Sequence, residues 1–385
     1  MTLTFITNFI NHHQVPVADE FYNTPGLNYT FIATMAPLEL YLKTGYPDFS
    51  NKPYLLKAYE NEENYKKAME LAEKSDVVII GAASDEFIKE RLKQNKLTFR
   101  YDERWLRNGY HSLLSPRAWW NIYKAHAKYR DKELYMLCAS AYTAFDASLF
   151  FSYPNKCYKW GYFTKVEELD IEKVVQEKRN KTIEILWVAR FLDCKHPELP
   201  VKLAKNLKDK GYEFQVKMVG SGELMKKTEH LIGKLGVGDC VSLIGNMPND
   251  EILSLMKQSH IFVFTSDRKE GWGAVLNEAM SNGCAVVASN MIGAAPYLIE
   301  HGENGFLFKS LDLDSLTEQV EFLLNNKLLR DKLSINAYKS MREIWSPKNA
   351  ASNFLKLTDS ILKNEIVEIE IGPCCKAPVY NKCSC

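Results

Sequence analysis

The sequence lacks an excess of either charge. Its 385 residues include 49 Lys and Arg against 48 Asp and Glu, a formal net charge of +1. This balance excludes the broad basic surface typical of nucleic-acid-binding proteins, so any attraction to an anion must be local. Internal repeats and low-complexity tracts are also absent, and 46% hydrophobic residues exclude a largely disordered chain.

Signal-peptide features and long hydrophobic runs are scarce as well. The start has no basic segment and soon reaches the polar run Asn11-His12-His13-Gln14, so we expect a cytoplasmic protein. The segment 134–153 is about as long as a membrane span and carries one formal charge, Asp146. Serines and threonines interrupt it, and we therefore expect a buried strand there and not a membrane span.

The cysteines do not form a disulfide pattern. Five of the nine are scattered singly and are expected to be reduced core residues: Cys138, Cys157, Cys194, Cys240 and Cys284. The other four, Cys374, Cys375, Cys383 and Cys385, lie in a tail over 366–385 that we expect to be disordered. Their spacing is not that of paired zinc knuckles, so no metal site is predicted.

Short apolar runs alternate with longer segments of helical periodicity, which predicts an α/β fold with parallel sheets. In open parallel sheets, ligands bind outside the carboxyl ends of the strands, so the residues after each run are the candidates for function. The predicted strands are Leu3–Phe9, Val77–Ile80, Leu134–Ala139, Ile183–Val188, Phe214–Val219, Val241–Ile244, Ile261–Phe264, Ala285–Ala288 and Phe306–Phe308.

A charged stretch over 167–181 divides the chain and indicates a linker or connecting helix. We expect one domain over 1–170 and a second over 180–345. A helix over 347–365 follows, with its apolar residues on one stripe.

The most informative stretch follows the predicted strand Ile261–Phe264. A loop carries Glu270 with Gly271 and Gly273, and a helix carrying Glu278 comes next. The glycines allow close approach of a ligand to the backbone, and the free N–H groups at the helix start favour an anion such as phosphate. Taken alone, an early glutamate is more often a residue that complements the helix dipole.

The whole stretch resembles the retaining glycosyltransferases of family 4, which have the GT-B architecture. Their signature is two glutamates separated by seven residues, a small-residue helix, a glycine and a valine-rich strand, and Glu270 and Glu278 match it. The resemblance extends downstream through 293–308, with Ala294 where a second glycine is common. Upstream it includes 186–197, 219–223 and 243–248, and His196-Pro197 replaces a usual glycine.

The resemblance implies two Rossmann-like domains whose parallel sheets face a central cleft, with the final helix returning to the first domain. Arg190 and Lys195 would bind the donor diphosphate, Glu278 the ribose hydroxyls, and Glu270 with the backbone of 271–273 the sugar. Fixed cations stabilise a departing diphosphate, so no metal or other cofactor is expected. A UDP-sugar is favoured over a GDP-sugar as donor. Further donor-binding candidates are Gly220, Gly222, Asn246, Trp272, Ala274 and Val275.

The first half matches the family less closely, as expected for a domain that binds the acceptor. Asn11, His12 and His13 follow the first strand, where the family has a loop facing the donor sugar. We take His13 as a catalytic candidate, with Asn11 and His12 on the acceptor side. A structural role for these histidines is an equal alternative, and a metal site would need a third ligand.

A locally basic segment lies over 86–109, with seven Lys or Arg against four Asp or Glu and with interleaved apolar residues. Such a segment fits peripheral contact with anionic lipid headgroups or a lipid-linked acceptor. A solvated helix face explains it at least as well.

The resemblance implies a retaining, metal-independent hexosyltransferase. It would move a sugar from a nucleotide-diphosphate sugar to a hydroxyl of a glycan or lipid-linked acceptor in polysaccharide biosynthesis, at the cytoplasmic face of the membrane. The alternative is a non-catalytic subunit of the same fold that binds sugar nucleotides or serves as a membrane-associated scaffold. A dinucleotide-dependent oxidoreductase is disfavoured because Gly220-Ser-Gly222 lacks the third glycine of that fingerprint. A glycoside hydrolase is disfavoured because two glutamates around one helix start do not flank a scissile bond.

Overall fold

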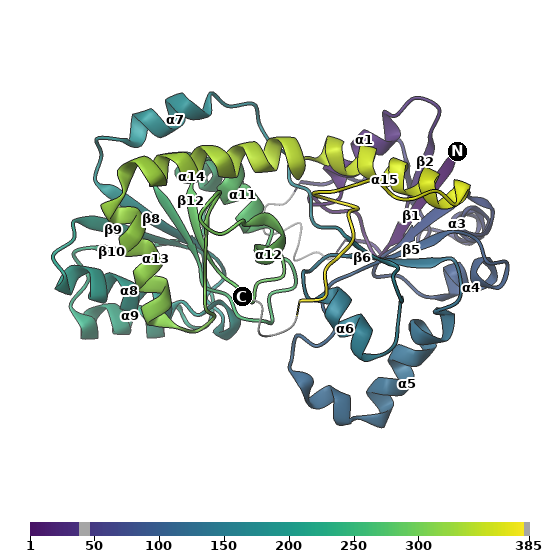
Figure 1. Cartoon of the computed structure of the whole chain (residues 1–385), viewed down its shortest axis with the longest axis horizontal. Helices are drawn as coiled ribbons and strands as arrows, with labels where there is room; N and C mark the ends of the chain where they lie inside the picture. The colour runs from purple at the N-terminus through teal and green to yellow at the C-terminus, as the bar shows by residue number, and fades with distance from the viewer. Residues whose placement is uncertain (38–46, 381–385) are drawn as a thin grey trace. The chain divides into compact units, whose positions relative to one another are not determined.

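A computed structural model describes residues 1–37 and 47–380 of the chain. The chain divides into two compact units (Figure 1). Among the described residues, unit 1 comprises 1–165 and 344–380, and unit 2 comprises Val166–Glu343. Each is an α/β unit with its own parallel sheet.

Within the described residues, the sheet of unit 1 has seven strands in the order β3-β2-β1-β4-β5-β6-β7, and all neighbours are parallel. The order in which strands are added reverses between β1 and β4: β2 and β3 lie on the far side of β1, and β5 to β7 on the far side of β4, as in doubly wound nucleotide-binding folds. The strands are β1 (Thr2–Thr7), β2 (Asn28–Ala33), β3 (Leu55–Lys57), β4 (Val77–Ile80), β5 (Thr98–Asp102), β6 (Leu134–Cys138) and β7 (Cys157–Lys159).

Helices cover both faces of this sheet, as the near-continuous apolar strands require. One face packs on α3, α4 and α6 through residues such as Ile6, Val78 and Met136. The other packs on α1 and α15, where the Phe354 ring lies 5.6 Å from that of Phe21 and 4.9 Å from that of Phe99. The helices are α1 (Val15–Tyr22), α3 (Glu62–Lys74), α4 (Glu86–Lys93), η1 (Tyr110–Leu114), α5 (Pro116–Ala125), η2 (Ala127–Tyr129), α6 (Thr143–Leu149) and α15 (Pro347–Lys363).

Unit 2 repeats the plan with strand order β10-β9-β8-β11-β12-β13, again parallel throughout. In order of sequence this is 3-2-1-4-5-6, the doubly wound arrangement, with its reversal between β8 and β11. The strands are β8 (Ile183–Val188), β9 (Phe214–Val219), β10 (Val241–Gly245), β11 (Ile261–Phe264), β12 (Ala285–Ser289) and β13 (Phe306–Phe308).

The helices of unit 2 form two layers. Helices α8, α9 and α13 pack on one face around Trp187, Val216 and Leu316, while α7, α10, α11 and α14 associate on the other (Figure 1). The helices are α7 (Ile171–Lys178), η3 (Asp193–Lys195), α8 (Glu198–Asp209), α9 (Met225–Leu235), α10 (Asn249–Gln258), α11 (Val275–Ser281), α12 (Ala295–Leu298), α13 (Leu313–Asn325), α14 (Lys327–Lys339) and η4 (Ser340–Ile344).

Side-chain caps begin several of these helices. Ser346 accepts from the Asn349 N–H at 3.2 Å ahead of Pro347, and so begins α15. Asp312 accepts from the Ser315 N–H at 3.0 Å and caps α13. The Asp312-Leu-Asp314 sequence is therefore a helix start.

The structure gives little support to contact between segment 86–109 and a membrane, which stays a prediction. Three of its cations are buried: Arg91 is fully enclosed and donates to the carbonyl oxygens of Asp76 and Leu97 at 2.8 and 2.6 Å, and Arg100 and Arg104 are also in the interior. Burial lowers the pKa of Arg91 to about 10. The segment folds as α4 and β5 and packs its apolar residues into the core, so it offers no apolar face to lipid.

The expectation of a disordered tail is wrong for the residues described, 366–380. Cys374 and Cys375 are buried, and their backbone pairs with β7: the Cys374 N–H donates to Lys159 O at 2.7 Å, and the Lys159 N–H donates to Cys375 O at 2.8 Å. Since β7 is an edge strand, the tail satisfies backbone groups that would otherwise face solvent. Cys383 and Cys385 lie outside the described residues.

The other cysteines agree in part with the expected core positions. Cys138, Cys240 and Cys284 are buried thiols, whereas Cys157 and Cys194 are only half-buried. The segment 134–153 forms β6 and α6. Among the described residues, no helix is both long enough and apolar enough to cross a bilayer, and no cluster of three or more His, Cys, Asp or Glu has metal-binding geometry.

Candidate functional site

The strand order of unit 2 reverses between two adjacent parallel strands, β8 and β11. β8 and β11 are paired at Ile185 and Ile261, but the strands that follow them in sequence lie on opposite sides. The loops leaving their carboxyl ends therefore diverge at this edge of the sheet, which is the position where doubly wound folds bind ligands. The loop after β8 carries Arg190 and Lys195, and the loop after β11 carries Glu270.

Lys195 and Glu270 form an ion pair across this point. The Lys195 ammonium contacts Glu270 Oε2, and each side chain is 15% exposed. The Lys195 Nζ also lies 5.8 Å from the centre of the Phe264 ring. Partial burial strengthens the attraction relative to a surface pair. A polyphosphate binding at this point would compete with Glu270 for the ammonium and would leave the carboxylate available to hydroxyl donors.

The backbone of the two loops is held together beneath that pair. Thr265 Oγ1 donates to Lys195 O at 2.7 Å, and the Asp267 N–H donates to Cys194 O at 3.0 Å. Trp187, fully buried on β8, donates its Nε1 proton to Thr265 Oγ1 at 2.9 Å. The positions of Lys195 and Glu270 are thus set by the core of the unit and not only by their own contact.

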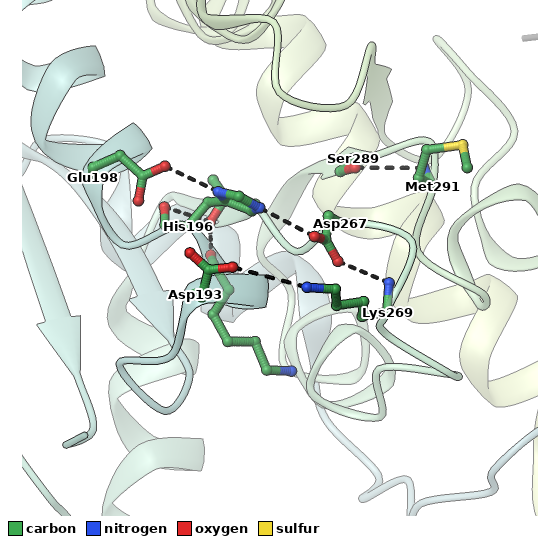
Figure 2. A network of polar contacts seen from close by, with 9 residues as sticks. Asp193, His196, Glu198, Asp267, Lys269, Ser289 and Met291 are labelled. Atoms are coloured by element: carbon green, nitrogen blue, oxygen red, sulfur yellow. Dashed lines mark hydrogen bonds and ion pairs between the residues drawn. The ribbon is translucent and has the colours of Figure 1, made fainter. Parts of the chain in front are cut away.

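His196 connects the same loops through its side chain (Figure 2). Its Nε2 lies 3.3 Å from Asp267 Oδ2, and its Nδ1 lies 3.0 Å from Glu198 Oε1. Hydrogen bonds to Asp267 and to Glu198 raise the pKa of His196 to about 9. The imidazole is therefore protonated at neutral pH and donates from both nitrogens. We call His196, Asp267 and Glu198 the histidine clamp.

The backbone of His196 is left-handed, with φ of 50°. Glycine is the residue that adopts this conformation at least cost, which explains why a glycine would be usual at the position of His196. Figure 2 also shows that the Asp267 side chain accepts from the Lys269 N–H, at 2.8 Å, so the clamp orders the turn leading to Glu270.

The predicted glycines after β9 are required by backbone packing. A Cβ at Gly220 would lie 2.0 Å from Ala189 O, and one at Gly222 would lie 2.5 Å from Phe191 O. Both have positive φ, 129° and 154°. These glycines therefore allow the loop after β9 to pack directly on the loop carrying Arg190, and any contact of theirs with a donor stays a prediction.

The remaining donor-side candidates divide between the surface and the core. Arg190 and Asn246 are exposed at the carboxyl ends of β8 and β10, and no partner of the Arg190 guanidinium occurs among residues 1–37 and 47–380. Trp272 is buried and donates its Nε1 proton to Asn277 Oδ1 at 2.9 Å. Its side chain is a core element, and any contact of Trp272 with a donor stays a prediction.

Helix α11 begins directly after these residues, at Val275, and is preceded by Ala274 as its cap residue. Gly273 has φ of 93°, and a Cβ there would lie 2.7 Å from the Phe264 ring. Glu278, in the first turn, is partly buried without a hydrogen-bonding partner for its carboxylate in the described part of the chain, and burial raises its pKa to about 7. A group that donates hydrogen bonds would stabilise the ionised form.

Unit 1 places its candidates at its own reversal point, in the loop after β1. Asn11 Oδ1 accepts from the His13 N–H at 3.0 Å, and the His13 ring stacks on Tyr162 with centres 5.1 Å apart. Burial, and then the neighbouring His12, hold the pKa of His13 well below its usual value, and burial lowers that of His12 to about 4. Both are therefore neutral at pH 7. His13 Nδ1 is buried and has no hydrogen-bond partner among the described residues.

Comparison with known proteins agrees with the position of the site in unit 2. Residues 170–340 match the family model described as "Glycosyl transferases group 1". The matched residues lie in unit 2, comprise β8 to β13 with their loops, and so include Arg190, Lys195, Glu270 and Glu278. We refer to this region, which is similar to a glycosyltransferase group 1 domain, as the group 1 domain.

Two curated relatives are similar over about half of this chain. An uncharacterized glycosyltransferase of Methanocaldococcus jannaschii is 26% identical over 202 residues, 51% of this chain and 50% of that protein. The capsular polysaccharide biosynthesis glycosyltransferase CapM of Staphylococcus aureus is 27% identical over 207 residues, 51% of this chain and 52% of that protein. The chain thus matches about half the length of each relative.

A solved structure matches nearly the whole chain in fold. HepE of Anabaena, crystallised in complex with UDP, superposes with a TM-score of 0.66 at 15% identity, covering 94% of this chain and 100% of that one. At this identity the likeness establishes the fold alone. Together with the two parallel-sheet units, it shows that the α/β fold is of the GT-B class.

The sequence did not indicate the histidine clamp of the group 1 domain, which leads to the first prediction. Replacing His196 by glycine relieves the left-handed backbone but removes both ion pairs, whereas alanine also keeps a backbone penalty of about 1 kcal/mol. At pH 6.5 we expect melting temperatures to fall in the order wild type, His196→Gly, His196→Ala. For this partly exposed group, the clamp's contribution after solvent screening is about 1–2 kcal/mol.

The pH dependence distinguishes the clamp from a simple turn. Because the pKa of folded His196 is raised from 6.5 to about 9, the stabilisation is complete below pH 6.5 and is lost as the pH rises through 9. The difference between wild type and His196→Gly, measured by thermal unfolding from pH 6 to 10, should therefore shrink at high pH. A glycine variant at least as stable as wild type at pH 6.5 would show that the ion pairs contribute nothing.

Proposed function

We propose that the chain is a retaining, metal-independent glycosyltransferase. It would transfer a hexose from a nucleotide-diphosphate sugar, with a UDP-sugar as the first candidate, to a hydroxyl of a glycan or lipid-linked acceptor. The observation that carries this proposal is the Lys195–Glu270 pair at the strand reversal of a group 1 domain. A role in surface polysaccharide synthesis is supported by the similarity to CapM.

In this proposal, the cations act on the leaving group. Arg190 and Lys195 contact the diphosphate and stabilise the charge that develops on it as the bond from the sugar C1 to the phosphate oxygen breaks. Because fixed side-chain cations supply this charge, the proposed reaction needs no bound metal. The N-terminal end of α11, which begins at Val275, adds to the positive potential.

The carboxylates bind the sugars of the donor. Glu278 accepts from the ribose hydroxyls, and Glu270 with the backbone of 271–273 binds the transferred sugar. The acceptor oxygen forms the new bond to C1 on the face from which the diphosphate leaves, and its proton passes to the departing diphosphate. The configuration at C1 is retained, and neither glutamate serves as a nucleophile.

Unit 1 would receive the acceptor beside the loop after β1. His13, neutral and with an unpaired buried Nδ1, is suited to exchange a hydrogen bond with a hydroxyl. Asn11 fixes the backbone of His13 and so belongs to the same loop structure.

The test is a panel of UDP-, GDP- and ADP-sugars, measured by thermal shift and by transfer to glycan and lipid-linked acceptors. A bound donor raises the melting temperature through its affinity for the folded state. We expect the largest shift with a UDP-sugar, together with transfer. Binding without transfer to any acceptor would instead identify a non-catalytic sugar-nucleotide-binding subunit.

The same measurement at two pH values examines Glu278. Since burial raises its pKa to about 7 and ribose hydroxyls bind the ionised form, the thermal shift should be larger at pH 8 than at pH 6. Glu278→Gln should bind more weakly and lose this pH dependence. An unchanged pH dependence in the variant would assign it to another group.

A further inference from the structure

Helix α5 of unit 1 exposes an unusual set of side chains. Among the described residues, none of its side chains is buried, although it carries two tryptophans and a tyrosine. Trp120 is 56% exposed and Tyr123 48%, and Leu114, just ahead of the helix, is 87% exposed. Large apolar groups clustered on one surface commonly mark an interaction site. We call Leu114, Trp120 and Tyr123 the aromatic surface.

The aromatic surface is held rigidly. Trp119 donates its Nε1 proton to Leu113 O at 2.7 Å and packs edge-on against Phe150, with ring centres 4.6 Å apart. Phe150 ends α6, which lies beside α5 in Figure 1. Trp120 and Tyr123 are exposed, and their rings stack with centres 5.9 Å apart.

Phe151, which follows Phe150 in sequence, is also exposed. Phe151 is 68% exposed and has a left-handed backbone, with φ of 53°. That conformation is unfavourable for an aromatic residue, and an exposed ring gains no packing energy to offset it. The backbone strain at Phe151 is therefore not offset by burial of its side chain.

The charge around the surface has one sign. No Asp or Glu occurs between Glu103 and Asp131. Arg117, Lys124 and Lys128 are exposed, and the Lys124 Nζ lies 4.8 Å from the centre of the Trp120 ring. These three cations form no ion pair within the described part of the chain. The surface therefore presents aromatic and aliphatic groups inside a positive field.

We propose that the aromatic surface docks on a bilayer containing anionic lipid. Tryptophan and tyrosine favour the headgroup level of a membrane, where the ring is in an apolar environment and the polar atom stays hydrated. A short helix in this position lies in the plane of the interface, and each nearby Lys or Arg adds to the attraction by anionic headgroups. An acidic protein would match the charge but would not require an exposed Leu114 and Phe151 beside the aromatic rings.

This inference goes beyond the proposed transfer reaction and does not depend on it, because the surface lies outside the residues assigned to the donor and acceptor. It also assigns the contact to a surface made by residues later than segment 86–109, in which Arg91, Arg100 and Arg104 are buried. The docking would hold unit 1 where a lipid-linked hydroxyl is available.

The experiment is sedimentation of the full chain with vesicles of phosphatidylcholine alone and with 30% phosphatidylglycerol. We expect binding to the anionic vesicles at least about tenfold tighter than to the neutral ones, and weaker binding at high salt. The double variants Trp120→Ala/Tyr123→Ala and Lys124→Glu/Lys128→Glu should each lose at least about tenfold in affinity. Matched controls are Phe322→Ala and Lys227→Glu/Lys234→Glu, which alter exposed residues of unit 2.

A second measurement locates the contact. Vesicles with brominated acyl chains quench tryptophans that enter the interface, so the extent of quenching should fall in W120F, a variant that keeps an aromatic ring. Equal binding to neutral and anionic vesicles, unchanged affinity in both double variants, or no binding to any vesicle would overturn the proposal. Capture by an acidic polypeptide without vesicle binding would overturn it in favour of a protein partner. Donor-dependent thermal shifts should be the same in all these variants, which separates this test from that of the transfer function.

Discussion

Lys195→Ala is expected to lower the transfer rate by at least about 100-fold while the protein stays folded. The ammonium is a fixed charge in a partly buried site, and removing one such stabilising group from a developing anion commonly costs about 3–4 kcal/mol in the activation free energy. Glu270→Ala should have a comparable effect through loss of sugar positioning. Rates with a UDP-sugar at saturating acceptor measure both.

The two variants act on one ion pair, so they should not be additive. Lys195→Ala leaves the Glu270 carboxylate partly buried without its partner, and some of the loss will come from that group. The double variant Lys195→Ala/Glu270→Ala separates the two contributions. Lys205→Ala is the matched control, because it removes a lysine of α8 that pairs with Asp209 on the surface of the same domain. Wild-type turnover in either single variant would contradict the assigned roles.

Gly220→Ala is expected to destabilise the group 1 domain by at least about 3 kcal/mol. The new Cβ would lie 2.0 Å from Ala189 O, a backbone atom that cannot move without displacing the loop carrying Arg190. The positive φ of 129° adds strain. For a domain of this size the melting temperature should fall by roughly 6–12 °C, as measured by calorimetry.

Two other glycines serve as controls for that substitution. Gly236 has a positive φ of 63° but no atom within 4 Å of an added Cβ, so Gly236→Ala reports strain without a clash. Gly233, inside α9, has neither strain nor a clash, and Gly233→Ala should be neutral or stabilising by up to about 1 kcal/mol. If Gly220→Ala behaved like Gly236→Ala, the close packing of the two loops would not be rigid.

The strands that could be predicted share one property. Val77–Ile80 and Ile261–Phe264 are apolar runs of strand length followed by a turn signal, and the structure has strands with the same bounds. Such runs are buried on both faces of a parallel sheet, so their composition alone distinguishes them. The strands β2, β3, β5 and β7 were not predicted; in β5, Arg100 and Asp102 interrupt the apolar pattern.

The candidate site was predictable in type but not in detail. The two glutamates and two cations were chosen from a resemblance, and the structure brings Lys195 and Glu270 into contact although 75 positions separate them. Their catalytic roles stay predictions. The sequence could not predict that Trp272 is buried and Trp120 exposed. The side chain of Trp272 is 1% exposed and that of Trp120 is 56% exposed.

Composition and apolar periodicity are local properties of the chain, and they were enough to establish the α/β class and the alternation of strands and helices, because burial selects apolar residues at fixed spacings. The histidine clamp, the enclosed Arg91 and the tail paired with β7 depend instead on which loops and edges become neighbours after folding. A polar or charged residue has the same letter whether it meets solvent or a distant partner. Its environment is therefore defined by contacts far apart in sequence, which exist only in the folded protein.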